Sequence, residues 1–425
     1  MREMKDSGIE WLGEIPAEWK RKKIKNAVAL IGSGTTPAST CLQYYESEDV
    51  NWIQSGDIYG VDTISKTSTL VSNAAVRSLS ALHVYNPDFI VIAMYGGSVG
   101  NIAISKIQAC VNQACCCIQT DSQNDLKFMY YWIYMCKSDF LRISEGGGQP
   151  NISQSKIKNQ YYMQPPLPEQ RRIADFLDAK CAEIDALTAD IQTQIDTLEQ
   201  YKRSVITEAV TKGLNPDVEM KDSGLKWIGK IPSSWNVMPN KYLMKKKKVI
   251  CPVYKGEDIL SLTMKGVIVR DLDAGGKMPT SFDGYQRLEP GNLLMCLFDI
   301  DVTPRCIGLI KQAGLSSPAY SQFELNDMGN ADYYCYYYTM LDNDKTLLHL
   351  AKNLRHSLTE DQLGAISVIV PPVQEQKRIA NFLDAKCEEI DKVIAAKIEQ
   401  LALIDEYKKS LIYEYVTGKK EVPAI

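Results

Sequence analysis

Histidine, long apolar runs and excess positive charge are scarce in this sequence, and each shortage excludes a class of protein. The 425-residue chain has three histidines, His83, His349 and His356, which are too few and too scattered for a metal site or a catalytic triad. The longest apolar runs, such as residues 89–94, are far shorter than the roughly 18 residues that a membrane helix needs. The formal net charge of -4 excludes a protein that coats nucleic acid by charge alone, so any nucleic-acid contact must be local.

The sequence also lacks the motifs that carry catalysis. Without a G-x-x-x-x-G-K-[ST] phosphate loop, nucleotide hydrolysis is not expected. The 12 cysteines include no Cys-x-x-Cys pair, and Cys115, Cys116 and Cys117 cannot all face one ion on a strand, so we interpret them as buried small hydrophobes. The tyrosine-rich residues 333–338 are compatible with base stacking and with core packing. Because the N-terminus has no apolar signal-peptide core, we expect reduced thiols and a cytoplasmic location.

Two segments of the sequence occur twice, which is the strongest signal in the chain. Residues 4–19, MKDSGIEWLGEIPAEW, return at residues 220–235 as MKDSGLKWIGKIPSSW, with 10 of 16 positions identical. Residues 165–187, PPLPEQRRIADFLDAKCAEIDAL, return at residues 371–393 as PPVQEQKRIANFLDAKCEEIDKV, with 16 of 23 positions identical. The two halves of the chain therefore begin and end alike.

Between these repeats the two halves differ, because residues 24–148 and 240–354 share little. Drift after a duplication would blur all regions alike. We therefore interpret the repeats as a constant frame and the segments between them as two diverged domains. Four tryptophans recur in register and are expected to join each domain to the frame. They are Trp11, Trp19, Trp227 and Trp235.

The second repeat predicts two long helices. After Pro168 the first copy has no glycine or proline until Gly213, roughly 44 residues, or about 66 Å at the rise of an α-helix. Apolar residues recur every seven positions in both copies, which is a coiled-coil pattern. They are Leu177, Ile184, Ile191, Leu198 and Val205 in the first copy and Leu383, Ile390, Ile404 and Leu411 in the second. Antiparallel pairing would put the diverged domains at opposite ends, whereas an ordinary helical hairpin would leave the duplicated flanks unexplained.

A second line of apolar side chains is expected beside the first. Its members are Leu187 and Tyr201 in the first copy and Val393 and Tyr407 in the second. Lys397 stands where the first copy has Ile191, so one position of the seam is polar and could fix the register.

Each diverged segment has the mixed pattern of an α+β domain. Short apolar runs bounded by turn residues predict strands, and residues 126–143 predict a helix. The predicted strands are residues 89–93, 102–105, 259–262 and 293–297. The expected fold is two globular α+β domains joined by two long helices in an antiparallel coiled coil, with an internal pseudo-twofold repeat. The expected boundaries are 1–164 for the N-terminal domain, 165–213 for the first helix, 214–370 for a linker and the C-terminal domain, and 371–425 for the second helix and tail.

Basic and small polar residues in the diverged segments are candidates for nucleic-acid contact. Lys22 and Lys23 lie in one basic cluster and Lys246 and Lys247 in another, at similar places in the two halves. A solvated surface and phosphate contact explain these clusters about equally well. A second set combines short polar side chains with nearby glycines that permit close approach to a phosphate or base. It comprises Thr35, Thr36, Ser98, Asn101, Gln149 and Asn151.

At PPLPEQRRIADFLDAKCAEID, SGIEWLGEIPAEW and their two copies, the whole chain resembles the specificity subunit of type I restriction-modification enzymes. The resemblance implies a noncatalytic subunit whose two target-recognition domains each bind one half of a bipartite double-stranded DNA site. It implies that the paired helices act as a ruler and dock two methyltransferase subunits, which use S-adenosylmethionine to methylate adenine. Motor-nuclease subunits would join this core. No cofactor and no membrane contact are expected for the chain itself.

Two alternatives belong to other classes. A self-sufficient methyltransferase or nuclease is disfavoured by the missing cofactor, phosphate-loop and metal motifs, and binding of S-adenosylmethionine by the isolated chain would support it. A coiled-coil adaptor without DNA specificity explains the helices but not the two diverged domains. The sequence does not give the DNA target, because side-chain readout depends on docking geometry.

Overall fold

A computed structural model describes residues 2–145, 150–273, 279–303, 305–350 and 357–423, and it confirms the expected α+β fold with two sheet-containing domains and two long helices in contact. The chain divides into two compact units. The N-terminal unit comprises Met1–Asp190 with Glu399–Ile425, and the C-terminal unit comprises Ile191–Ile398. Within the described ranges, no helix has the length and apolar character needed to cross a bilayer.

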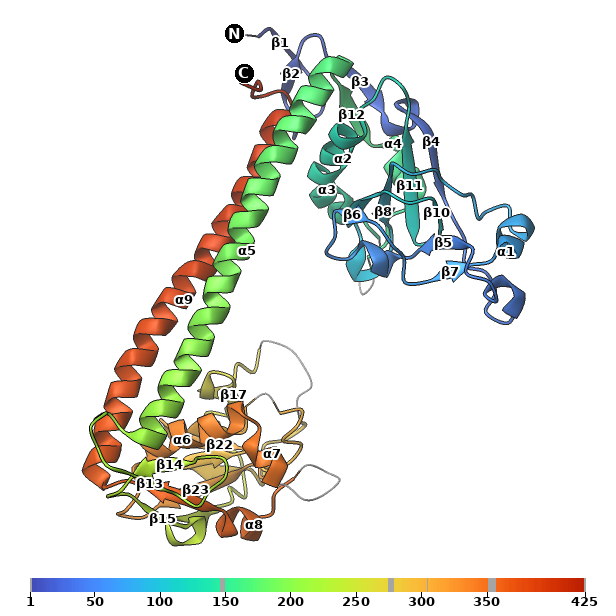
Figure 1. The fold of residues 1–425 in the computed structure, drawn as a ribbon. Coiled ribbons are helices and arrows are strands. Elements are labelled where there is room, and N and C mark those ends of the chain that lie inside the picture. Colours follow the sequence, from blue (N-terminus) through green and yellow to red (C-terminus); the bar gives the residue numbers. More distant parts are fainter. Residues whose placement is uncertain (1, 146–149, 274–278, 304, 351–356, 424–425) are drawn as a thin grey trace. The chain divides into compact units, whose positions relative to one another are not determined.

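The main sheet of the N-terminal unit has five strands in the order β4-β11-β8-β9-β6 (Figure 1). They are β4 (Val28–Ser33), β6 (Thr63–Ile64), β8 (Phe89–Ala93), β9 (Ile102–Ser105) and β11 (Cys115–Thr120). The predicted strands 89–93 and 102–105 are confirmed as β8 and β9. Cys116 faces one hydrophobic cluster, whereas Cys115 and Cys117 face another, so the three thiols do not converge. Burial raises the pKa of Cys116 to about 12, which keeps this thiol protonated.

A smaller sheet and several helices complete this unit. The strands β10 (Ala109–Val111), β5 (Val50–Ile53) and β7 (Leu70–Val71) form the sheet, beside α1 (Asn73–Ser78). The predicted helix at 126–143 is observed as two, α2 (Leu126–Met135) and α3 (Lys137–Arg142). Asp125 caps α2, because its side chain accepts hydrogen bonds from the backbone amides of Lys127 and Phe128. Residues of α2 such as Trp132 pack in the core with the main sheet.

The C-terminal unit has a four-stranded main sheet in the order β16-β23-β20-β21. Its strands are β16 (Met244–Lys247), β20 (Leu293–Met295), β21 (Ile307–Leu309) and β23 (Ser321–Leu325). Two further two-stranded sheets belong to this unit, the hairpin β17 (Leu260–Thr263) with β18 (Gly266–Val269) and the pair β19 (Gln286–Leu288) with β22 (Gly314–Ser316). The predictions at 259–262 and 293–297 therefore fall on β17 and β20.

The tyrosine-rich segment forms α6 (Ala331–Asn343), which precedes the short helix α7 (Thr346–Leu350). Four of its tyrosines are fully buried and contact one another edge to face or stacked. They are Tyr333, Tyr334, Tyr337 and Tyr338. Core packing, and not base stacking, is therefore the role of this cluster.

Four neighbouring strands have the same order in the two main sheets although their sequences diverge. In the N-terminal sheet the order of these strands is β4-β11-β8-β9, and in the C-terminal sheet it is β16-β23-β20-β21. All neighbours in both series are antiparallel. The helix that follows β11 is α2, and the helix that follows β23 is α6. The diverged segments are therefore two versions of one domain.

The repeated flanks build the same frame in each unit. The hairpins are β1 (Met4–Asp6) with β2 (Glu14–Pro16), and β13 (Met220–Asp222) with β14 (Lys230–Pro232). Next come β3 (Lys20–Lys23) with β12 (Tyr161–Gln164), and β15 (Asn236–Pro239) with β24 (Ser367–Val370). A capped short helix precedes the last strand of each unit, α4 (Gln154–Asn159) or α8 (Glu360–Ala365).

The Glu-Gln pair of the second repeat explains why this repeat is so similar in the two halves. Glu169 accepts a hydrogen bond from the indole nitrogen of buried Trp19 at 3.1 Å, and Glu375 accepts one from buried Trp235 at 3.0 Å. The following glutamine, Gln170 or Gln376, is fully buried and uses both ends of its amide. It accepts from the backbone amide of the α2 or α6 cap residue and donates to two carbonyls.

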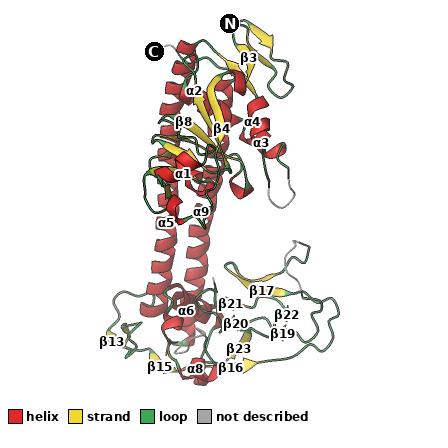
Figure 2. Ribbon diagram, turned by 90° about the vertical axis from the view of Figure 1, so that its right-hand side faces the viewer, coloured by secondary structure: helices red, strands yellow, loops and turns green. Residues whose placement is uncertain are grey.

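The long helices are α5 (Leu167–Lys212) and α9 (Val373–Val416), drawn in red in Figure 2. Each helix belongs to both units. The helix α5 begins in the N-terminal unit and ends in the C-terminal unit, whereas α9 begins in the C-terminal unit and ends in the N-terminal unit. Leu411 and Val416, near the end of α9, pack in the N-terminal core, and Ile206 and Val210, near the end of α5, pack in the C-terminal core. Each frame is therefore completed by a helix end that comes from the other half of the sequence.

The predicted seam residues lie between the helices to differing degrees. Leu177, Ile184, Ile191, Leu383, Ile390 and Leu411 are buried, and Leu198, Val205 and Ile404 are half-buried. The predicted second line is wrong, because its four members expose between 43% and 59% of their surface. They are Leu187, Tyr201, Val393 and Tyr407.

The true second line lies four residues after each member of the first, not three. In α5 it comprises Cys181, Thr188, Ile195, Lys202 and Ala209, all buried or half-buried. In α9 it comprises Cys387, Ile394, Leu401, Lys408 and Tyr415. This alternation of three and four residues is the heptad seam of a coiled coil.

Ion pairs set the register of the two helices. Lys408 pairs with Asp185 at 2.6 Å in the N-terminal unit, and Lys202 pairs with Asp391 at 2.6 Å in the C-terminal unit. These two pairs are the same contact repeated with the partners exchanged, since both lysines and both aspartates are separated by the repeat offset. Polar Lys397, the predicted register residue, donates a hydrogen bond to the side chain of Gln194.

Candidate nucleic-acid interface

One end of the N-terminal main sheet gathers the loops that carry most of the predicted contact residues. Ser33, the last residue of β4, pairs with Cys116, and Ala93, the last residue of β8, pairs with Cys115. The chain therefore leaves β4 and β8, and enters β11, at the same end. Residues 34–36, 94–101 and 112–114 form the loops at this end.

Backbone and side-chain hydrogen bonds join these loops. Thr36 Oγ1 donates to Gln113 Oε1 at 2.5 Å, and the amide of Met94 donates to the carbonyl of Ala114 at 2.7 Å. The amide of Asn101 donates to the carbonyl of Ser98 at 2.9 Å. The sheet end thus presents one connected polar surface.

A fourth segment, residues 150–152, lies against the same loops. Asn151 forms an isolated bridge with Tyr95, and the amide of Ile152 donates to the carbonyl of Met94 at 2.9 Å. Five of the predicted residues therefore meet at this end of the sheet, namely Thr35, Thr36, Ser98, Asn101 and Asn151. Gln149 lies outside the described residues. Thr36 and Asn151 are exposed, and the other three are half-buried.

Two exposed tyrosines at this surface were not predicted. Tyr95 exposes 43% of its surface and Tyr59 exposes 73%. Tyr59 follows the 3-10 helix η3 (Ser55–Ile58), which contacts η4 (Gly96–Ser98) in the second loop. Exposed aromatic rings beside polar loops are suited to stacking on bases. No local sequence signal distinguishes these tyrosines from core tyrosines, because only the tertiary contact between η3 and η4 brings Tyr59 here.

The basic residues Lys22 and Lys23 lie elsewhere. Both lysines are in β3, where they pair with Tyr162 and Tyr161. Because β3 directly precedes β4 in the chain, it lies near the beginning of β4. The beginning of β4 adjoins the frame, since Asn124 Nδ2 donates to the carbonyl of Ala27 there. The structure therefore does not bring these two lysines to the loop-bearing end.

The expectation that the two basic clusters occupy similar places is wrong. The strand equivalent to β3 is β15 (Asn236–Pro239), which has no lysine, whereas Lys246 and Lys247 lie in β16, the equivalent of β4. Both lysines also have carboxylate partners: Lys246 pairs with Glu360, and Lys247 pairs with Glu289 at 2.6 Å. Sequence alone misplaced them, because the two basic runs are offset by one strand.

The C-terminal unit has the equivalent loop-bearing end. Met295, the last residue of β20, pairs with Ser321, the first residue of β23. The amide of Leu358 donates to the carbonyl of Leu297 at 2.8 Å, as Ile152 does to Met94 in the other unit. The loop between β20 and β21, of which residues 296–303, 305 and 306 are described, takes the place of residues 94–101. Phe298 and Val302 in this loop expose 38% and 73% of their surface.

Among the described ranges, no group of three or more His, Cys, Asp or Glu side chains could hold a metal ion. Burial and a neighbouring tyrosine raise the pKa of both Tyr334 and Tyr338 above its ordinary value, so these phenols are structural donors.

The exposed members of the rejected second line form two equivalent helix faces. In the N-terminal unit Leu187 and Tyr407 are exposed, and the pKa of Lys180 is raised by Glu183 and, to a smaller extent, by Tyr407. In the C-terminal unit Val393 and Tyr201 are exposed, and the pKa of Lys386 is raised by Glu389 and, to a smaller extent, by Tyr201. Each face therefore combines an aliphatic side chain, a tyrosine and a Lys-Glu pair in the same relation.

Comparisons with known proteins agree with this architecture. The model of the family described as "Type I restriction modification DNA specificity domain" matches residues 16–197 and 317–400, more than half of the chain. The chain is 23% identical to the type I restriction enzyme MjaX specificity subunit of Methanocaldococcus jannaschii, over 97% of this chain and 96% of that one. It is 29% identical to the MjaIX specificity subunit of the same organism, over 44% of this chain and 43% of that one.

A solved structure has the same fold. Its title is "Structural basis underlying complex assembly and conformational transition of the type I R-M system". The TM-score is 0.68 at 14% sequence identity, and the alignment covers 96% of this chain and 99% of the other. At this identity the likeness shows the fold alone.

Proposed function

Because this chain belongs to the family of type I restriction-modification DNA specificity subunits, we propose that each of its two sheet domains reads one half of a bipartite DNA site and that its helices dock two methyltransferase subunits and set the spacing of the half-sites. A specificity subunit is the noncatalytic part of such an enzyme, and S-adenosylmethionine is used by the partner methyltransferase subunits. Motor-nuclease subunits would join the complex, and its DNA substrate favours a cytoplasmic location.

The observation that carries the proposal is the retained strand order under diverged loops. A sheet and frame that keep their contacts, while the loops at one end change, are what two domains with different DNA targets require. We propose residues 1–164 and 214–370 as the two recognition domains, with 165–213 and 371–425 as the helical regions. A self-sufficient enzyme or a plain adaptor does not require two such loop sets.

In the N-terminal domain the proposed contact surface is the loop-bearing sheet end. The polar side chains there, Thr35, Thr36, Ser98, Asn101 and Asn151, are candidates for hydrogen bonds to base edges or phosphates. Tyr59 and Tyr95 add exposed rings. Lys22, Lys23, Lys246 and Lys247 remain candidates for phosphate contact, although Lys246 and Lys247 would have to leave their carboxylate partners.

Modified-base sequencing of DNA from a host that carries this gene and a cognate methyltransferase gene tests the proposal. The expected result is methylated adenine in a motif with two specified parts and an unspecified spacer. Alanine at Thr36, Asn151 and Tyr59 together should relax one part only. Leu42→Ala is the matched control, since this exposed residue lies outside the three loops. A single continuous motif, or no methylation with any partner, would contradict the proposal.

The methyltransferase subunits are proposed to dock on the two equivalent helix faces. Two identical partners need two equivalent surfaces, and the faces around Leu187 with Tyr407 and around Val393 with Tyr201 meet this requirement. Apolar and tyrosine side chains that remain exposed on a coiled coil, at corresponding positions in both copies, are typical of an interface.

Removing one face should remove one methyltransferase subunit. With Leu187→Asp and Tyr407→Asp together, native mass spectrometry should find one methyltransferase per chain instead of two. Ile398→Asp is the control, because Ile398 is also exposed on α9 but its counterpart in α5 is the polar Gln192. Two subunits still bound to the double variant would contradict the assignment.

A further inference from the structure

In each recognition domain, one charged residue at the same distance from a helix cap holds the central loop, which joins β8 to β9 or β20 to β21. Lys137 is the first residue of α3, directly after α2, and Asp342 lies in α6. The helices α2 and α6 are in the same register, because their cap residues, Asp125 and Asn330, both donate a backbone hydrogen bond to the frame glutamine. Twelve residues after the cap stands Lys137 in one domain and Asp342 in the other. The two residues have opposite charges, and both contact the loop.

In the N-terminal domain the contact is a single hydrogen bond with close packing. Lys137 Nζ donates to Asn101 Oδ1 at 2.8 Å. A Cβ atom added to Gly100 would lie 3.1 Å from Lys137 Cγ, so the lysine stem already lies against the loop backbone. Gly100 has a φ of +78°, which favours glycine at this position. Lys137 thus fixes the second half of residues 94–101.

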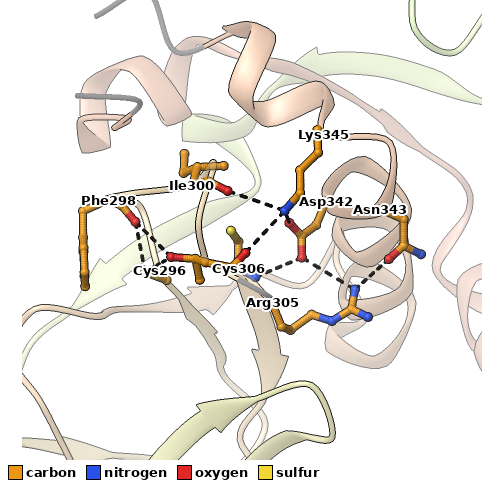
Figure 3. A network of polar contacts seen from close by, with 9 residues as sticks. Cys296, Phe298, Ile300, Arg305, Cys306, Asp342, Asn343 and Lys345 are labelled. Carbon is orange, nitrogen blue, oxygen red and sulfur yellow. Dashed lines mark hydrogen bonds and ion pairs between the residues drawn. The ribbon is translucent and has the colours of Figure 1, made fainter. Parts of the chain in front are cut away.

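In the C-terminal domain the contact is a buried network (Figure 3). The side chain of Asp342 is almost completely buried. Its carboxylate accepts a hydrogen bond from the amide of Cys306 at 2.9 Å and pairs with Arg305 at 3.6 Å and with Lys345 at 3.2 Å. Lys345 Nζ also donates to the carbonyls of Thr303 at 3.3 Å and Ile300 at 3.5 Å. The carboxylate therefore ties the end of the loop to α6, and Lys345 joins the middle of the loop to the same carboxylate.

The backbone of the network is held in conformations that need support. Asp299 has a φ of 47° and Lys345 a φ of 52°, and residues other than glycine adopt such values only where their surroundings fix them. Burial, followed by the nearby Asp342, raises the pKa of Cys306 to about 12, so the thiol stays protonated beside the carboxylate. The fixed part of the loop thus lies against the Asp342 carboxylate and its partners.

The loop held by this network has an exposed apolar tip. Phe298 and Val302 lie in the clamped loop and are exposed, and the ring of Phe298 stacks on Tyr320 at a centroid distance of 6.2 Å. Well-packed apolar side chains often stabilise a fold as much as a buried carboxylate with two cations does, so stability alone does not account for this network. Apolar side chains held rigidly at a base-contacting surface can discriminate thymine by its methyl group.

We propose that Lys137 and Asp342 are positioning residues for specificity, each of which fixes the central loop of its own domain for one half-site. This inference rests on the proposed function and adds to it which residues keep the loops in place. Neither side chain needs to touch DNA. Lys137 acts through Asn101 and Gly100, and Asp342 acts through Arg305, Cys306 and Lys345.

The test uses the full chain with its methyltransferase subunits and modified-base sequencing. Asp342→Ala should lower discrimination at one half-site by roughly ten- to a hundredfold, because a misplacement of about 1 Å has effects of this size. The other half-site should stay unchanged. Lys137→Ala should show the reciprocal pattern. Asp332→Asn, at the first turn of the same helix α6, is the matched control and should leave both half-sites intact.

Each outcome has a distinct meaning. If the wild-type chain gives no bipartite motif, the proposed function fails. If the wild-type motif is bipartite but Asp342→Ala keeps full discrimination, or relaxes both half-sites equally, the positioning role is overturned. Should the alanine variant not assemble, Asp342→Asn decides, because it keeps an acceptor for the amide of Cys306 and removes only the charge. It should relax the same half-site by a smaller factor.

Discussion

The two recognition domains differ in how their central loops are held, although their sheets have the same strand order. In the N-terminal domain residues 94–101 are short, rich in glycine and fixed through one lysine. In the C-terminal domain the loop is longer, and its described residues Ile300, Thr303, Arg305 and Cys306 are held by a buried carboxylate with two cations. The distance from the helix cap is retained, twelve residues in both domains, while the sign of the charge is inverted. The frame therefore conserves the place where a loop is fixed and leaves the loop itself free to change.

The largest expected effect comes from changing the distance between the two domains. We expect that seven residues inserted after Ile195 in α5 and seven after Lys397 in α9 keep the seam, because a whole heptad is added to both helices. The addition is about 10.5 Å, which corresponds to about three base pairs. The methylated motif should keep both half-sites and gain a spacer of about three base pairs.

Its control is an insertion of four residues at the same two places, which shifts the apolar seam and should impair assembly. An unchanged spacer in the seven-residue variant would show that the helices serve assembly and not measurement.

The next largest effect is expected on the stability of the two frames. Trp19→Ala and Trp235→Ala each remove a fully buried ring with a hydrogen-bonded indole, so each should lower the free energy of unfolding by about 3–5 kcal/mol. Urea denaturation followed by fluorescence should show each variant shifting the transition of its own unit. Trp11→Ala, at a half-buried site, is the milder control. A Trp19 variant that assembles normally but methylates a different sequence would refute the structural role.

The smallest effect is expected for the coupling energies of the two ion pairs of the seam. Burial lowers the pKa of Lys408, but the hydrogen bond and charge of Asp185 outweigh it, so the folded pKa lies above the ordinary 10.5. The contribution to stability is therefore full below pH 10.5 and is lost as the pH rises through the folded pKa. A double-mutant cycle with Lys408→Met and Asp185→Asn should give a coupling energy of about 0.5–1 kcal/mol at pH 7.

The cycle for Lys202 with Asp391 should give a smaller coupling energy, because Lys202 is more exposed than Lys408, 28% against 16%. Equal coupling at pH 7 and at pH above 11 would contradict the assignment to an ion pair.

The parts of the fold that depend on local pattern could be predicted from the sequence. Strands β8 and β9 are continuous apolar runs between turn residues, and the long helices lack glycine and proline, so their bounds followed closely. The second line of the seam could not be predicted, because its true members include Cys181, Thr188 and Lys202, which are weakly apolar or charged. Leu187 and Tyr201 gave the stronger apolar signal and are exposed.

Only the part of the candidate interface that depends on local sequence pattern could be predicted. Glycine-flanked polar residues mark loops, so five of the proposed contacts share one sheet end. Tyr59 was missed, because its position depends on contact between η3 and η4, segments far apart in the sequence. The lysine clusters were misplaced, because strand equivalence depends on pairing, which the two runs of charge do not encode.

The exchange of helix ends between the two frames determines the order in which the chain can fold during synthesis. Gly418 lies against Trp19, where an added Cβ would come to 3.0 Å from the indole ring, so the first frame is closed by residues made about 400 positions after Trp19. At 5–20 residues per second, Trp19 waits roughly 20–80 s for this contact. The C-terminal unit is one continuous stretch of chain and can close earlier. A ribosome that stops before residue 399 therefore releases a protein in which only the C-terminal unit has all of its residues.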